Sequence, residues 1–203
     1  LAKKLTIKNF FIERLLNLVI QASKLIKNKT NIYSGAASLS FASVQYIINN
    51  VKNISEKKIL LFGTGKIGRN TCENLIKHTK NNHIYLINRT KEKAENLKNL
   101  FDKLDIIEWG NIPDFDMIIN ATSLGLKEED KTNLDFSKIG TDKFFYDVIY
   151  NPKETNFLKE GKKLGNKTEN GKLMFIYQAL LAFNVWHGIK PEINDEVINL
   201  LDQ

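Results

Sequence analysis

The stretch KILLFGTGKIGRNTCENLIK, residues 58–77, decides the fold of this chain. It begins with the short apolar run Lys58–Phe62, which has the length and composition of a buried strand. It ends with Lys66–Lys77, which we predict to be a helix. Between the two lies Gly63-Thr64-Gly65-Lys66-Ile67-Gly68, a GxGxxG motif. The stretch therefore predicts a strand, a glycine-rich turn and a helix in immediate succession.

In this context the GxGxxG motif indicates a dinucleotide site. Gly63 allows the tight turn, Gly65 lets the backbone approach a pyrophosphate, and Gly68 lets the helix pack closely on the strand. The helix N-terminus offers free N–H groups and the positive end of its dipole to the phosphates. We expect the whole loop, with Thr64, Lys66 and Ile67, to bind the cofactor. The alternative is a glycine-rich turn that binds nothing.

The next predicted strand, Ile84–Ile87, indicates which dinucleotide is bound. NAD-binding domains usually place an acidic residue about 20 residues beyond the glycines, where it holds the ribose 2′-hydroxyl. Here the chain has Asn88-Arg89-Thr90, with Lys93 one helical turn later. Two cations without a carboxylate favour the 2′-phosphate of NADP. The alternative is that both cations are merely solvated, although the helix dipole disfavours cations at a helix start.

Strands and helices alternate along most of the chain, which predicts an α/β fold. Parallel neighbours need crossover connections, so we expect a Rossmann-like, doubly wound parallel sheet preceded by an N-terminal helical arm. The expected arm covers residues 1–55 and the NADP-binding domain with its C-terminal helices covers 56–203. Expected helices are Phe10–Ile26, Ser34–Val51, Lys66–Lys77, Lys91–Leu104, Glu154–Leu164 and Lys172–Trp186. The remaining expected strands are Asp105–Glu108, Met117–Asn120 and Lys143–Val148.

Composition narrows the class of protein further. The chain of 203 residues is 42% hydrophobic and 26% charged, as in an ordinary globular domain. Its single cysteine, Cys72, precludes an internal disulfide and fits a reducing compartment, so we expect the cytoplasm. No apolar run approaches the roughly 18 residues that suggest a membrane span, and we expect no membrane partner. The net charge of +7 is spread over scattered lysines, which favours a phosphorylated cofactor over nucleic acid.

Four segments together resemble the shikimate dehydrogenase family, which reduces 3-dehydroshikimate to shikimate with NADPH. They occur in the family's order and cover about residues 85–203. The segments are INRTKEKAENL (87–97), INATSLGL (119–126), YDVIYNPKET (146–155) and GKLMFIYQALLAFNVWHGI (171–189). The resemblance implies an NADP-dependent oxidoreductase with a shikimate-like substrate.

Carried over by position, the resemblance assigns further site residues. Thr122 and Ser123 would line the cofactor groove, and the nicotinamide would contact Val148, Gly171 and Met174. Tyr150 and Gln178 would face the substrate, where an amide can both donate to and accept from a polyhydroxylated ring. Without the resemblance, Met174 reads as a core residue and Gln178 as a surface residue.

The N-terminal part is similar to a second family, glutamyl-tRNA reductase, which serves tetrapyrrole biosynthesis. The similarity lies in residues 13–50 and in KKILLFGTGKIGRNTCENL, residues 57–75. Under this interpretation a tRNA partner is expected. The two resemblances meet near Ile84–Arg89, so the chain reads as a hybrid of the two families.

The sequence offers no obvious side chain to act as the catalytic acid or base. Residues 1–50 hold neither the Lys/Asp pair of shikimate dehydrogenases nor the nucleophilic cysteine of glutamyl-tRNA reductases, so the catalytic residues are left unassigned. Cys72 is expected to be a structural residue, and His78, His83 and His187 have no metal-ligand spacing. A catalytically silent NADP-binding module is therefore a third interpretation. The apolar face of the first helix predicts a homodimer, unless the arm folds back on its own sheet.

Overall fold

The computed structural model describes residues 10–29, 39–81 and 83–200. The chain divides into two compact units, Leu1–Ala36 and Ala37–Gln203. The described part of the first unit is one helix, α1 (Phe10–Lys29), whose large apolar side chains are exposed, for example Leu18 at 54% and Val19 at 57%. Within the described residues, no helix combines the length and apolarity needed to cross a membrane.

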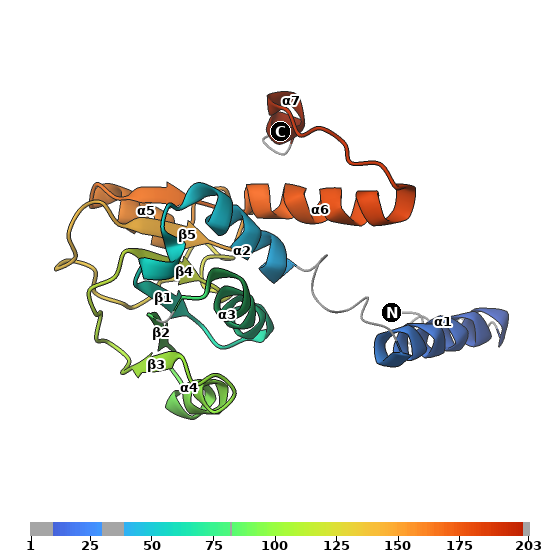
Figure 1. Ribbon diagram of the computed structural model, residues 1–203, viewed down its shortest axis with the longest axis horizontal. Helices are drawn as coiled ribbons and strands as arrows, with labels where there is room; N and C mark the ends of the chain where they lie inside the picture. Colours follow the sequence, from blue (N-terminus) through green and yellow to red (C-terminus); the bar gives the residue numbers. More distant parts are fainter. Residues whose placement is uncertain (1–9, 30–38, 82, 201–203) are drawn as a thin grey trace. The chain divides into compact units, whose positions relative to one another are not determined.

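The second unit is built on a parallel sheet of six strands, which confirms the expected α/β fold (Figure 1). The strands run in the order β3-β2-β1-β4-β5-β6, and every neighbouring pair is parallel. This order reverses at β1, as in doubly wound dinucleotide-binding sheets. The strands are β1 (Ile59–Phe62), β2 (Ile84–Ile87), β3 (Leu104–Ile107), β4 (Met117–Asn120), β5 (Phe144–Asp147) and β6 (Lys167–Glu169).

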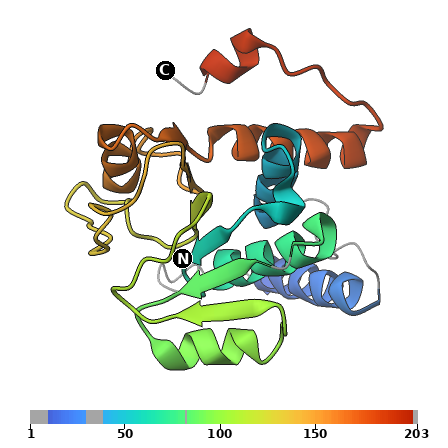
Figure 2. The same cartoon turned by 60° about the vertical axis from the view of Figure 1, so that its left-hand side comes forward.

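Two hydrophobic cores cover the two faces of the sheet, because alternate residues of a strand point to opposite sides. Ile59 and Leu61 of β1 belong to the core that packs against α2, α3, α4 and α6. Leu60 and Phe62 belong to the core that packs against α5 and the adjoining loops. Helices accordingly lie on both sides of the sheet (Figures 1 and 2). Their bounds are α2 (Leu39–Asn50), η3 (Ile54–Glu56, a 3-10 helix), α3 (Lys66–Thr79), α4 (Lys91–Lys98), α5 (Asn156–Lys163), α6 (Lys172–His187) and α7 (Asp195–Leu200).

Most element boundaries differ from expectation by one to three residues, and the larger differences concern α4, β6 and α7. Helix α4 ends at Lys98 rather than Leu104, because Leu104 already pairs with Ile84 in the sheet. Strand β6 lies in the expected loop between Gly165 and Gly171; it is a polar edge strand of three residues without apolar alternation. Helix α7, which has no buried residue, was also not expected. The segment 34–38 of the second expected helix lies outside the described residues.

Helix α2 packs with the sheet and not in a separate arm. Ala42, Val44 and Ile47 are completely buried in the core, and Tyr46 stacks on Tyr146 of β5 with ring centroids 5.7 Å apart. Small side chains on α2 let it approach α3 and α6 closely. By its packing α2 belongs to the second unit, whereas the expected arm extended to residue 55.

Candidate functional site

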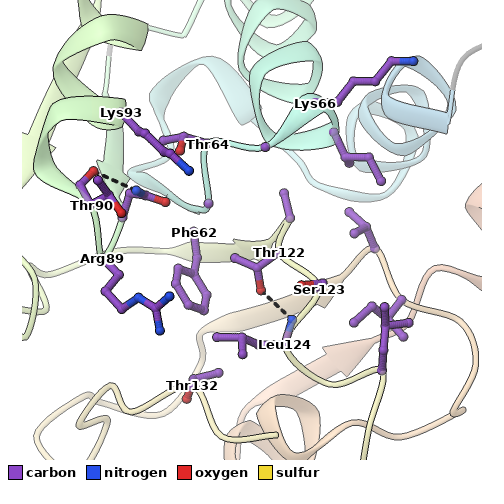
Figure 3. Close-up of a pocket in the computed structure, with 18 of the residues that line it drawn as sticks. Phe62, Thr64, Lys66, Arg89, Thr90, Lys93, Thr122, Ser123, Leu124 and Thr132 are labelled. Carbon is purple, nitrogen blue, oxygen red and sulfur yellow. Dashed lines mark hydrogen bonds between the residues drawn. The ribbon is translucent and has the colours of Figure 1, made fainter.

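A pocket of about 930 Å³ opens at the carboxyl ends of β1, β2, β4 and β5 (Figure 3). In a doubly wound sheet this edge is where ligands bind. Most of the predicted site residues line the pocket; they are Gly63, Thr64, Gly65, Lys66, Ile67, Asn88, Arg89, Thr90, Lys93, Thr122, Ser123, Val148, Tyr150 and Met174. Gly68, Gly171 and Gln178 do not line it.

The glycine loop follows β1 directly and turns into α3. Gly63 has a φ of +107°, which a residue with a side chain rarely adopts, and its N–H donates to the Ile87 carbonyl at 3.0 Å. A Cβ on Gly68 would overlap the carbonyl oxygen of Gly63, so this glycine permits α3 to start against the turn. A Cβ on Gly65 would meet no atom within 4 Å. Gly63 and Gly68 thus shape the loop, while Gly65 presents bare backbone at the pocket.

The two predicted cations lie at the β2 side of the pocket. Figure 3 shows Lys93 projecting from α4 toward Thr64, whereas Arg89 projects from the end of β2 in the direction of Phe62. Both are exposed, and among the described residues no carboxylate pairs with either. Asn88 fixes the turn that contains Arg89, because its Nδ2 donates to the Thr90 carbonyl at 2.8 Å. An anion in this part of the pocket would meet two available positive charges.

The loop after β4 is held by the side chain of Asn120. Its Oδ1 accepts from the backbone N–H of Thr122 at 3.1 Å and from the Thr122 hydroxyl at 2.7 Å. Its Nδ2 donates to the Leu124 carbonyl at 3.0 Å. The Thr122 hydroxyl oxygen also accepts from the N–H of Leu124 at 3.0 Å, as Figure 3 shows. These bonds fix the backbone that carries Thr122 and Ser123 into the pocket.

A buried carboxylate, Asp147, holds the loop after β5. It accepts hydrogen bonds from the Thr155 hydroxyl at 2.6 Å, from the backbone N–H of Ile149 at 3.0 Å and from Asn120 Nδ2 at 3.2 Å. Burial nevertheless raises the pKa of Asp147 to about 6, because desolvation outweighs the three hydrogen bonds that favour the charged form. Asp147 thereby joins the ends of β4 and β5 to the start of α5.

The predicted nicotinamide and substrate residues come from β5 and α6. A Cβ on Gly171 would overlap the Val148 carbonyl, so this glycine lets α6 start against the end of β5. Met174, 2% exposed, lines the pocket from the first turn of α6. Tyr150 also lines it and stacks on Phe175 with centroids 4.6 Å apart. Gln178 is half-buried one turn beyond Met174, outside the pocket lining.

Several residues that build this site were not predicted from the sequence. Asn120 lies in INATSLGL and Asp147 lies in YDVIYNPKET, but the role of each depends on a hydrogen bond between the ends of two strands. Phe62 and Trp109 line the pocket from the ends of β1 and β3. A polar residue ending an otherwise apolar strand, as in MIIN, was the available signal for Asn120.

Cys72 is a packing residue, as expected. It is completely buried in the core, and burial raises the pKa of its thiol to about 12, which disfavours a reactive thiolate. Among the described residues, no group of three or more histidine, cysteine or acidic side chains is placed to hold a metal ion.

The fold is that of a Rossmann-like dinucleotide-binding domain. The model of the shikimate/quinate 5-dehydrogenase family matches residues 45–148, and the chain belongs to that family. The shikimate dehydrogenase (NADP(+)) of Pelagibacter ubique is 56% identical over 151 residues, which cover 74% of this chain and 57% of the relative. The resemblance to shikimate dehydrogenase is thereby confirmed.

The second resemblance is also confirmed. The glutamyl-tRNA reductase of Flavobacterium psychrophilum is 72% identical over 96 residues, which cover 47% of this chain and 23% of the relative. The chain thus spans less than two thirds of the curated relatives from both families.

Solved structures agree with the family. Shikimate dehydrogenase from Aquifex aeolicus superposes with a TM-score of 0.69 at 30% identity, covering 81% of this chain and 60% of the other. A shikimate dehydrogenase solved in complex with NADP+ has a TM-score of 0.69 at 32% identity, covering 80% of this chain and 60% of the other.

Proposed function

We propose that this chain is the NADP(H)-binding part of a shikimate dehydrogenase-type oxidoreductase, acting in the cytoplasm. The cofactor supplies hydride chemistry at its nicotinamide ring, which would convert 3-dehydroshikimate to shikimate. The observation that supports this proposal is the composition of the pocket, which brings together the glycine loop, the cations after β2 and the loops after β4 and β5.

Each part of the pocket has a task in this proposal. The N–H groups at the start of α3 bind the pyrophosphate, and bare backbone at Gly65 permits its close approach. Thr122 and Ser123 line the middle of the groove. Val148 and Met174 form an apolar wall that orients the nicotinamide and excludes water.

The substrate would lie at the α6 side of the nicotinamide wall. Tyr150 lines the pocket there, and its stacking on Phe175 limits how its ring can move. Gln178 lies on the same helix as Met174, one turn farther on. We assign Tyr150 and Gln178 to the hydroxyl groups of a shikimate-like ring, with Gln178 at the outer end.

The positions of Arg89 and Lys93 support NADP(H) over NAD(H). A guanidinium can bind a phosphate through two parallel hydrogen bonds, and an ammonium adds a second charge. Losing these charge-assisted bonds costs about 1.5–3 kcal/mol. We therefore expect NADP(H) to bind at least about tenfold more tightly than NAD(H), since 1.4 kcal/mol corresponds to a factor of ten.

Calorimetric titration of the 203-residue chain with both cofactors tests the proposal. Arg89→Gln should weaken NADP(H) binding and leave NAD(H) binding nearly unchanged. Arg69→Gln is the matched control, because Arg69 is exposed on α3 and does not line the pocket. Equal affinities of the parent protein for the two cofactors would contradict the assignment of Arg89 and Lys93.

A second candidate function is that of a glutamyl-tRNA reductase cofactor domain. The 72% identity over 96 residues favours it, and a tRNA-bearing partner would then be required. Oxidation of NADPH with 3-dehydroshikimate or with glutamyl-tRNA, each measured alone, separates the two activities. Because the rate with 3-dehydroshikimate is expected to be low, residual activity is measured at high protein concentration, and cofactor binding without residual activity on either substrate would favour a silent NADP-binding module.

A further inference from the structure

Three neighbouring strands bring an aromatic side chain, a cation and a second aromatic side chain to the carboxyl edge of the sheet. In the register of the sheet, Phe62 pairs with Ile87, and Ile87 pairs with Ile107. Arg89 lies two residues after Ile87, and Trp109 lies two residues after Ile107. Since the strands are parallel, all three side chains leave the sheet at the same edge. Phe62, Arg89 and Trp109 all line the pocket.

A defined turn holds Trp109 in this place. The Glu108 carbonyl accepts a hydrogen bond from the N–H of Asn111 at 3.1 Å, which closes a four-residue turn with Trp109 at its second position. Gly110 occupies the third position with a φ of +93°, the value that a type II turn requires there. Phe62 lies behind Trp109, with ring centroids 5.8 Å apart and planes tilted by 42°. Trp109 is half-buried and contacts the second core, so part of its ring remains at the pocket.

The location of Trp109 identifies the part of the ligand that it would meet. Strands β1, β2 and β3 form the half of a doubly wound sheet that receives one nucleotide, and the residues after β2 contact its ribose 2′ position. Arg89 and Lys93 make this half the adenosine 2′-phosphate half under the proposed function. The remaining group of that nucleotide is a purine base, a flat aromatic ring that stacks well on indole.

We propose that Trp109 forms the wall of the adenine subsite and stacks on the purine base of the cofactor. This inference rests on the proposed NADP(H) function and extends it to a residue outside the motifs that indicate that function. Phe62 supports the indole from behind, and the turn from Glu108 to Asn111 presets its position before the ligand arrives.

The chain offers a direct test, because it contains two tryptophans and Trp186 is 77% exposed outside the pocket lining. In Trp186→Phe, all tryptophan emission comes from Trp109. The probe is adenosine 2′,5′-bisphosphate, which carries the base and the 2′-phosphate without a nicotinamide. We expect saturable quenching of Trp109 emission by this probe, and no change with nicotinamide mononucleotide.

Affinity provides a second measurement. Base–aromatic stacking supports the estimate that Trp109→Ala weakens binding of the probe at least about fivefold. Trp109→Phe, which retains a stacking ring, should stay within about threefold of the parent protein. Trp186→Ala is the matched control and should bind the probe as the parent does. Thermal unfolding of each variant establishes that it is folded.

The possible failures are distinguishable by calorimetry on the parent chain. If the probe binds but leaves Trp109 emission unchanged, and Trp109→Ala binds it within twofold of the parent, the adenine-wall inference is overturned. If neither the probe nor NADP(H) binds the parent, the proposed function itself is overturned, and the inference with it.

Discussion

The Nδ2 atom of Asn120 lies 3.2 Å from each carboxylate oxygen of Asp147, at the point where β4 and β5 end side by side. Both side chains are completely buried. The same amide fixes the loop of Thr122, and the same carboxylate fixes the loop of Ile149. Two pocket-lining loops therefore share one polar connection beneath them, and disturbing either side chain should displace both.

The first prediction concerns the pH dependence of stability. The pKa of Asp147 is raised from 3.8 to about 6 in the folded chain, so the unfolded chain loses this proton first as the pH rises. As the pH rises from about 4 to about 6, titration of Asp147 should therefore make the free energy of unfolding fall by an amount on the order of 2–3 kcal/mol. Asp147→Asn should remove this fall.

Urea unfolding at several pH values measures the effect. Asp102→Asn, at an exposed position, is the matched control and should keep the slope of the parent protein. An Asp147→Asn profile that parallels the parent between pH 4 and pH 6 would show that Asp147 titrates as it does in the unfolded chain.

The second prediction separates two glycines of one motif. Gly68→Ala should lower the free energy of unfolding by about 1–3 kcal/mol, because its Cβ overlaps the backbone of Gly63. Gly65→Ala should fold normally, since its Cβ meets no atom within 4 Å. It should instead weaken NADP(H) binding at least about tenfold, equivalent to about 1.4 kcal/mol, because the methyl group faces the pyrophosphate.

Thermal unfolding and calorimetry read the two effects independently. Gly140→Ala serves as the control, because its Cβ would approach only the Lys143 side chain, at 3.9 Å. Normal cofactor binding by Gly65→Ala would show that the pyrophosphate does not approach the loop at this residue.

The third prediction is that the 203-residue chain turns over shikimate with NADP poorly. Within the described residues, the pocket lining contains no histidine, aspartate or glutamate. Its proton-transferring side chains are Lys66, Lys93, Lys131 and Tyr150, and the proposed function assigns none of them to proton transfer. Absence of general acid–base catalysis typically lowers a rate by about 10²–10⁴-fold. A steady-state assay at saturating cofactor measures it. An ordinary turnover number would reveal a proton-transferring group that the proposed function does not assign.

The fourth prediction concerns α1, whose apolar side chains Leu15, Leu18 and Val19 are each about half exposed, at 49%, 54% and 57%. We predict that the chain self-associates through this helix, because exposed apolar faces usually mark interfaces. Leu18→Asp should dissociate the dimer, whereas Asn17→Asp adds the same charge on the polar side of the helix and should not.

Light scattering across a concentration series decides between the alternatives. A species of the 23.3 kDa chain mass at every concentration would favour an arm that folds back on its own sheet. Leu18→Asp should in that case lower the melting temperature of a monomer.

Local patterns predicted most of the sheet. Apolar runs such as IYLI and MIIN gave β2 and β4 their observed bounds, because a buried strand needs consecutive apolar residues. Strand β6, KTE, has no such pattern, and its place in the sheet follows from backbone pairing with β5. Local patterns could not predict the placement of α2 either, since its burial depends on α3, α6 and β5.

The same division holds for the site. The glycine loop and Arg89 were predictable, because their chemistry is contained in contiguous residues. Trp109 and Asp147 were not, since each acquires a role only when strands distant in sequence align their carboxyl ends. Motifs therefore identify the parts that would touch phosphates, and the sheet register identifies the parts that surround them.

The stacking of Tyr46 on Tyr146 has a consequence for the order of folding on the ribosome. Helix α2 is translated before β5, and its aromatic partner on β5 follows one hundred residues later. At roughly 5–20 residues per second, the partner follows after an interval of about 5–20 s. Helix α3, which packs on α2, is translated before β5 and can cover part of α2 during that interval. Tyr46 nevertheless lacks its stacking partner until β5 is made, so the topology delays completion of this part of the core.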